Sequence, residues 1–227
     1  MNDPVSDLVS DSSNDFVGDF FIDVVAALIM ASAVALVGTV DTPARAQSGE
    51  RLAIGAALPM ADRPLSGAGG SSVTLSELQR ENGLVVLFWC NTCPWVDRWE
   101  DRVLEIARAN QSRGIGFAAV NPNDPVAYPD DDLSSMAERA EQAGYPFPYL
   151  RDEGSRLARA FGASRTPEVF VFGPDGALVY SGAVDDSPRG ASGVEQPYLS
   201  RVLGALAQGE AVPVRSTKAF GCTIKWQ

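Results

Sequence analysis

The clearest hydrophobic pattern in the chain alternates short apolar runs with segments of helical spacing. Residues 84–89 form a continuous apolar run, which is typical of a strand buried on both faces and predicts the centre of a sheet. Residues 96–110 carry apolar side chains at helical spacing, and Gly114 ends the connection beyond them. A second apolar run, 115–120, predicts a strand that ends in the loop 121–125.

The second half of the chain continues this alternation. Gly144 fits a helix stop, and the sequence Gly-Pro-Asp-Gly at 173–176 supplies the turn of a hairpin. The predicted elements are helices over 133–143, 155–161 and 197–208, and hairpin strands over 168–172 and 177–181. These patterns predict one α/β domain over residues 52–209 and a tail, 210–227, that packs on it. The stretch 55–72, rich in Gly, Pro, Ala and Ser, is expected to be a connection.

Residues 1–46 differ from the rest of the chain. Six aspartates recur at every fourth position from Asp3 to Asp23, and like charges at this spacing disfavour a helix, so we expect disorder. The uncharged stretch 24–40 and the sequence Ala-Arg-Ala ending at Ala46 are typical of a cleaved export signal. No positive charge precedes Arg45, however, so a membrane anchor and a buried helix of a cytoplasmic protein remain alternatives. We expect an exported or periplasmic protein, with membrane contact only if the apolar segment is retained.

Composition narrows the chemistry. The 227 residues include no histidine, which excludes Ser-His-Asp and Cys-His nucleophile pairs and histidine-containing metal sites. The formal net charge is −11, but residues 1–46 hold seven acids and one base, which leaves 22 acids, 17 bases and a net of −5 elsewhere. No basic stripe interleaved with aromatic residues is present, so nucleic acid is not an expected partner.

Two cysteines lie where the first predicted strand meets its helix. Pro94 is suited to the first helical position, which places Cys93 at the N-cap, where a thiolate faces unpaired N–H groups and the positive end of the helix dipole. Cys93 is therefore the expected nucleophile, and Cys90 is close enough in the chain to be its disulfide partner. Half of a zinc site is one alternative, although Cys222 is the only further cysteine; inert buried thiols are another.

Several motifs together resemble the thioredoxin superfamily and, more narrowly, its AhpC/TSA-related, peroxiredoxin-like members. They stand at residues 88–96, 121–125, 147–153, 164–170 and 221–226, so the resemblance spans roughly residues 52–226. It implies a thioredoxin-like fold with a central mixed β-sheet flanked by helices, thiol-based chemistry without a cofactor or metal, and an external electron donor.

The resemblance also assigns roles to single residues. The first catalytic cysteine of thioredoxins falls on Cys93, and the second falls on Val96, so the resolving thiol must be Cys90 or Cys222. The peroxidatic cysteine pattern of peroxiredoxins is absent. Thr166 and Pro167 match the cis-proline that lies beside the catalytic sulfur, with a trans-proline opening a strand as the alternative. We assign substrate contact to Thr166, Pro167 and Trp95.

The resemblance places a leucine, Leu87, where thioredoxins have the acid that assists their buried cysteine. Asp97, Glu100 or a water molecule could take over this proton transfer. In the tail, Cys222, Ile224 and Trp226 alternate, so in an extended tail they would share one face and could dock on the domain. Cys222 would then be either a buried structural thiol or a third redox partner.

Three functions are compatible with these features. The first is a thiol-disulfide oxidoreductase that acts on protein or small-molecule disulfides, with Cys93 as nucleophile and Cys90 as partner. The second is an atypical thiol peroxidase, in which a hydroperoxide oxidises Cys93 to a sulfenic acid. The third is a non-catalytic module that binds extended peptides at the Pro167 face. The fold does not decide among them.

Overall fold

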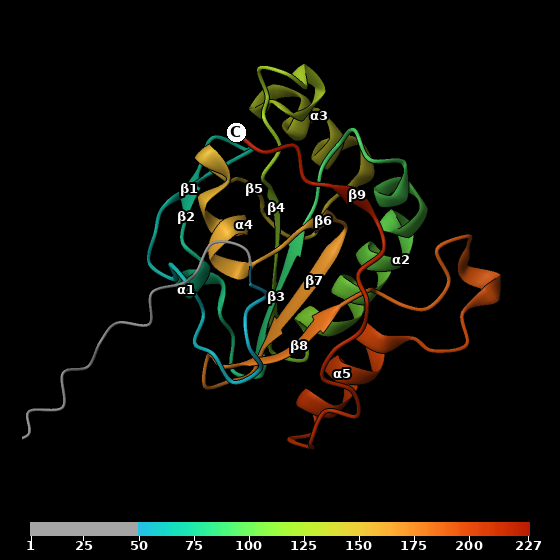
Figure 1. Cartoon of the computed structure of the whole chain (residues 1–227). Helices are drawn as coiled ribbons and strands as arrows, with labels where there is room; N and C mark the ends of the chain where they lie inside the picture. Colours follow the sequence, from blue (N-terminus) through green and yellow to red (C-terminus); the bar gives the residue numbers. More distant parts are fainter. Residues whose placement is uncertain (1–49) are drawn as a thin grey trace, which may run out of the picture. The chain divides into compact units, whose positions relative to one another are not determined.

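The computed structural model describes residues 50–227, so the acidic and apolar segments within residues 1–46 lie outside the described residues (Figure 1). None of the helices in residues 50–227 is long and apolar enough to cross a membrane. The strands are β1 (Leu65–Gly67), β2 (Ser72–Val73), β3 (Gly83–Phe88), β4 (Ile115–Asn121), β5 (Tyr149–Arg151), β6 (Arg165–Thr166), β7 (Glu168–Phe172), β8 (Leu178–Gly182) and β9 (Cys222–Thr223). The helices are α1 (Leu75–Leu78), α2 (Pro94–Gln111), α3 (Leu133–Ala143), α4 (Arg156–Phe161) and α5 (Tyr198–Leu206).

Seven strands form one mixed sheet in the order β2-β1-β5-β4-β3-β7-β8. Strand β3 pairs in parallel with β4 and antiparallel with β7, and all six of its residues are buried. The continuous apolar run around residues 84–89 therefore predicts the interior of the sheet correctly. The predicted mixed sheet flanked by helices is confirmed as well.

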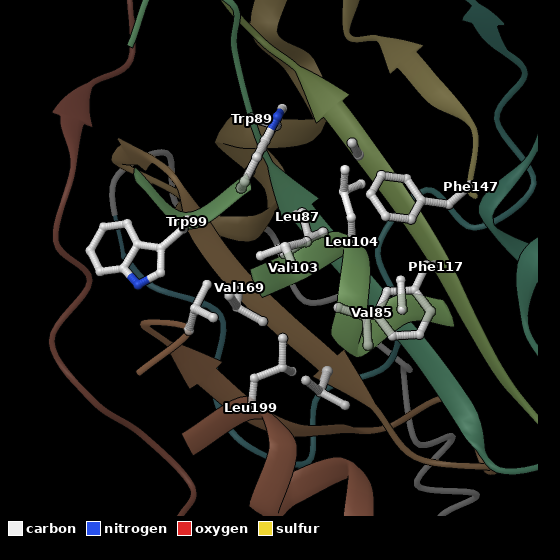
Figure 2. Packing of buried hydrophobic residues seen from close by; sticks show 14 of the residues in the cluster. Val85, Leu87, Trp89, Trp99, Val103, Leu104, Phe117, Phe147, Val169 and Leu199 are labelled. Atoms are coloured by element: carbon white, nitrogen blue, oxygen red, sulfur yellow. The ribbon is translucent and has the colours of Figure 1, made fainter. Parts of the chain in front are cut away.

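Helices cover both faces of the sheet and form a core with each of them. One core joins alternate β3 residues, such as Val85 and Leu87, to α2, α3 and α5, and Figure 2 shows these side chains packed against Val103 and Leu104 of α2. The other core joins the remaining β3 residues to α1 and α4. Because β3 is buried on both faces, its carboxyl end is held rigidly, and this end carries the cysteines.

Two predictions about extended segments are wrong. The stretch 55–72 is more than a connection, because it contains β1, whose Leu65 is 2% exposed and which pairs with β5. Strand β5 itself lies in a stretch for which we predict no strand. Both strands have only three residues, so neither gives a periodic pattern that could reveal it.

The C-terminal tail runs from α5 along β8 to β9 and then to α4 (Figure 1). In the tail, the backbone N–H of Thr217 donates a hydrogen bond to the backbone oxygen of Ser181 in β8. Beyond β9, the backbone N–H of Lys225 binds the Asn123 side chain, and Gln227 bonds to the segment before α4. The tail thus contacts the domain along the edge that carries the cysteines.

Candidate active site

Cys93 stands at the junction that the sequence predicts. It is the N-cap residue of α2, and Pro94 occupies the first turn. Its thiol makes no capping hydrogen bond to the helix and instead donates to the carbonyl oxygen of Thr166 at 3.0 Å. The predicted position is therefore confirmed, but the neutral thiol points toward the segment before Pro167 rather than along the helix axis.

The Thr166–Pro167 peptide bond is cis, as the resemblance implies. Thr166 joins both sulfurs of the motif: its carbonyl oxygen accepts from Cys93, and its Oγ1 lies 3.0 Å from Sγ of Cys90. Thr166 is 1% exposed, and Pro167 is buried too. Thr166 contacts both thiols and pairs with the tail strand β9, so a substrate that binds at Thr166 must displace a part of the chain.

The three thiols differ strongly in acidity. The pKa of Cys93 is lowered to about 5, chiefly by the hydrogen bond from the Cys90 thiol. Burial opposes this shift, and hydrogen bonds from the thiol and amide of Cys222 and from the amide of Val96 add to it. The same interaction with Cys93, together with burial, raises the pKa of Cys90 far above its ordinary value. Burial, followed by the bond to Cys93, raises the pKa of Cys222 to about 11. At neutral pH the site therefore holds one thiolate, Cys93, between two protonated thiols.

Cys222 reaches this site through β9. Strand β9 pairs antiparallel with β6, and Cys222 is the register partner of Thr166. Cys222 packs against the same core as Cys90 and Cys93 but is only half-buried, and all three cysteines are free. We predict that Cys222, Ile224 and Trp226 share one face that docks on the domain, and this is wrong for Trp226, which is 42% exposed. The centroid of its ring lies 4.5 Å from the guanidinium carbon of Arg159.

Trp95 borders a hollow that is lined mostly by residues of the tail. Its ring packs edge-on against Phe220 of the tail, with centroids 4.6 Å apart. The hollow has a volume of about 220 Å³ and is also lined by Arg165, Lys218 and Gly221. It combines aromatic walls with two cationic side chains.

A buried carboxylate that the sequence analysis missed holds the Cys90–Cys93 loop. Asp131 is 0% exposed, and its two oxygens accept hydrogen bonds from the backbone of Asn91 and the side chains of Thr92, Asn121 and Asn123. Its negative charge also contributes to the raised pKa of Cys90. No local pattern marks Asp131, because it ends a short 3-10 helix, Pro129–Asp131, and lies 40 residues after Asn91 in the sequence.

The two acids proposed for proton transfer are engaged elsewhere. The guanidinium of Arg139 binds Glu100 at 2.8 Å and Asp97 at 2.6 Å, and it also donates to the backbone oxygen of Asn91. Tyr145 donates its hydroxyl to Glu100. Asp97 and Glu100 therefore anchor α3 to the start of α2, and neither of them is hydrogen-bonded to a thiol.

A second buried acid fixes the segment around the cis-proline. Glu168, 1% exposed, accepts hydrogen bonds from the backbone of Ser164 and Arg165 and forms an ion pair with Arg51. These contacts fix the residues directly before Thr166 and tie them to Glu168, which follows Pro167. Within residues 50–227, no three His, Cys, Asp or Glu side chains are grouped so that they could hold a metal ion.

The mixed sheet, the cis-proline and two cysteines between a buried strand and its helix together define a thioredoxin-fold thiol protein. The AhpC/TSA family model matches residues 54–181, which is more than half of the chain. The chain therefore belongs to the AhpC/TSA family, and the resemblance stated from the sequence is confirmed.

Solved structures share the fold of this chain. An uncharacterized conserved protein from Geobacillus kaustophilus is 35% identical, with a TM-score of 0.72, over 77% of this chain and 93% of that one. A hypothetical protein from Sinorhizobium meliloti is 31% identical, with a TM-score of 0.73, and the match covers 78% of this chain and 97% of that one. The Xanthomonas campestris bacterioferritin comigratory protein, 20% identical with a TM-score of 0.51 over 69% and 99%, shares the fold. A search of curated protein sequences finds no match.

Proposed function

We propose that the protein is a thiol-disulfide oxidoreductase in which Cys93 is the nucleophile and Cys90 is the partner thiol. The observation that carries this proposal is the lowered pKa of Cys93, about 5, at the N-cap of α2 and in contact with the residue before a cis-proline. A thiolate at neutral pH is the reactive form in disulfide exchange. Membership of the AhpC/TSA family supports thiol-based redox chemistry, which requires no cofactor.

The reaction proceeds by two exchanges. The Cys93 thiolate attacks one sulfur of a substrate disulfide, the S–S bond breaks, and the released substrate thiolate takes up a proton. Cys90 then loses its proton, attacks Sγ of Cys93 and releases the second substrate thiol, leaving a Cys90–Cys93 disulfide. An external dithiol returns the two electrons. The bond to Cys93 is the largest cause of the raised pKa of Cys90, so Cys90 becomes more acidic once Cys93 is covalently bound.

A thiol peroxidase is the second candidate, and membership of the AhpC/TSA family favours it. In this reaction the Cys93 thiolate attacks a hydroperoxide oxygen, the O–O bond breaks, and the products are a Cys93 sulfenic acid and an alcohol or water. A neighbouring thiol then condenses with the sulfenic acid and releases water. Both candidates share the nucleophile and differ in the substrate.

Insulin reduction and hydroperoxide consumption, each measured on the full chain and on Cys93→Ser with a dithiol donor present, test the proposal. Insulin reduction that is lost in Cys93→Ser supports the oxidoreductase, and peroxide consumption that is lost in Cys93→Ser supports the peroxidase. Circular dichroism of both proteins checks that the serine variant is folded. If the folded wild-type chain is inactive in both assays, the proposal is wrong, and a module that binds peptides at the Pro167 face remains.

A further inference from the structure

The chain's own C-terminal strand occupies the edge beside the cis-proline. Strand β9 pairs antiparallel with β6, so that Cys222 lies opposite Thr166. The backbone oxygen of Thr166 lies 3.0 Å from Sγ of Cys93 and accepts its hydrogen bond when that thiol is protonated. The preceding residue, Gly221, is packed so closely on this backbone that a Cβ there would lie 2.2 Å from the Thr166 oxygen. Cys222 is therefore held against the same peptide unit as the nucleophile.

Cys93 thus has a thiol on each of two sides, and the two thiols differ in access to solvent. Cys90 is 1% exposed and lies behind Cys93, against Oγ1 of Thr166. Cys222 is half-buried, on a strand whose next residue, Thr223, is exposed. Cys222 packs against the buried cluster that contains Cys93 and lies opposite Thr166, and its thiol and amide lower the pKa of Cys93.

We propose that Cys222 is a second partner thiol of Cys93 and the sulfur through which external thiols exchange with the buried pair. The proposal rests on the proposed function, since it requires Cys93 to be a redox-active nucleophile. Strand β9 then carries a built-in disulfide partner, in addition to its packing role.

The disulfide with Cys222 forms and is reduced in balanced steps. Cys222 gives its proton to solvent and attacks Sγ of a Cys93–substrate mixed disulfide, and the substrate leaves as a thiolate that takes up a proton. A thiolate of an external dithiol then attacks Sγ of Cys222; the S–S bond breaks with its electron pair on Cys93. The second thiol of the dithiol attacks this new mixed disulfide, frees Cys222 and leaves the donor as a disulfide.

Access and leaving-group acidity both favour this route for reduction. Cys90 and Cys93 are each 1% exposed as free thiols, so an external thiol reaches a disulfide between them only after a part of the chain is displaced. In a Cys93–Cys222 disulfide the accessible sulfur is that of Cys222, and the group that leaves is Cys93, the most acidic of the three thiols. Thiol exchange is faster when the leaving thiol has the lower pKa.

Peptide mapping without reduction distinguishes the two disulfides. Trypsin leaves Cys90 and Cys93 together in the peptide 81–98 and Cys222 in the peptide 219–225. After oxidation of the full chain with diamide, we expect a product that joins these two peptides. The linked product should persist in Cys90→Ser and be absent in Cys93→Ser. A chain that oxidises only within peptide 81–98 would overturn the proposal while leaving the proposed function intact.

Reduction kinetics test the role of Cys222. The rate at which dithiothreitol reduces the oxidised chain should fall about tenfold or more in Cys222→Ser, because the accessible sulfur is lost. Thr223→Ala is the matched control on the same strand and should keep the wild-type rate. The double variant Cys222→Ser/Thr223→Cys moves the thiol to the exposed position and should not restore the rate. A wild-type rate in Cys222→Ser refutes the proposal, and a chain in which Cys93 forms no disulfide at all refutes the proposed function as well.

Discussion

Replacing Cys90 with alanine is the most direct test of how the site ionises Cys93, the proposed nucleophile. The hydrogen bond from the Cys90 thiol is the largest influence that lowers the pKa of Cys93 to about 5. A hydrogen bond to a charged group contributes about 1.5–3 kcal/mol, and one pH unit corresponds to about 1.4 kcal/mol. Removing it should therefore raise the pKa of Cys93 by about one to two pH units, while the contributions of Cys222 and Val96 remain.

The ultraviolet absorbance of the thiolate follows this pKa directly. Cys93 should be the only thiol that titrates between about pH 3 and pH 8, since the pKa of Cys90 is raised far above its ordinary value and that of Cys222 is about 11. We expect the midpoint to move upward in Cys90→Ala and to move less in Cys90→Ser, which keeps a hydroxyl donor. Equal midpoints in wild type and Cys90→Ala would show that Cys90 does not stabilise the thiolate.

The same ionisation affects stability. Because the pKa of Cys93 is lower in the folded chain than in the unfolded chain, its ionisation stabilises the fold increasingly as the pH rises above about 5. This contribution disappears as the pH falls through about 5. It should be smaller in Cys90→Ala, which urea unfolding at pH 5 and pH 8 measures.

Three further outcomes are expected. Gly221→Ala should push the tail away from the Thr166 backbone, because the added Cβ would collide with it. We expect the free energy of unfolding to fall by about 1–3 kcal/mol and Cys93 to be alkylated faster. An unchanged melting curve and labelling rate would contradict the close contact. Asp131→Asn removes acceptors for buried donors and should cost about 2–4 kcal/mol in urea unfolding, whereas a loss near zero would mean that the loop does not depend on it. We also propose export, so N-terminal sequencing of native protein should find a start near Gln47; intact residues 1–46 in a cytoplasmic fraction would contradict this.

The sequence predicts those parts of the fold whose local pattern reflects burial. The run at residues 84–89 is apolar throughout because β3 is covered on both faces, and α3 has its predicted bounds because Asp132 caps its start and Gly144 its end. The bounds of β7 are also as predicted. Strands β1 and β5 are too short to be periodic and are stabilised by pairing with distant segments, which a local pattern does not contain.

In the candidate site, too, local sequence rules predict some residues and miss others. Cys93 at the N-cap follows from Pro94, a local rule, and the cis bond at Pro167 follows from the resemblance. Asp131 binds Thr92 and Glu168 pairs with Arg51, and these partners lie far away in the sequence, so no local pattern indicates the two contacts. The tail contact of Cys222 depends on the pairing of β9 with β6, which the alternation of residues 222–226 suggests only in part.

The ion pair between Arg51 and Glu168 shows that the recognisable family segment is smaller than the unit that builds the site. A fragment cut to the matched residues 54–181 would lose Arg51 and leave the buried Glu168 carboxylate without its cation, directly after the cis-proline. It would also lose α5 and the strand that carries Cys222. Expression boundaries should therefore include residue 50 and extend to the C-terminus, since both flanks of the family segment contribute to the edge that carries the cysteines.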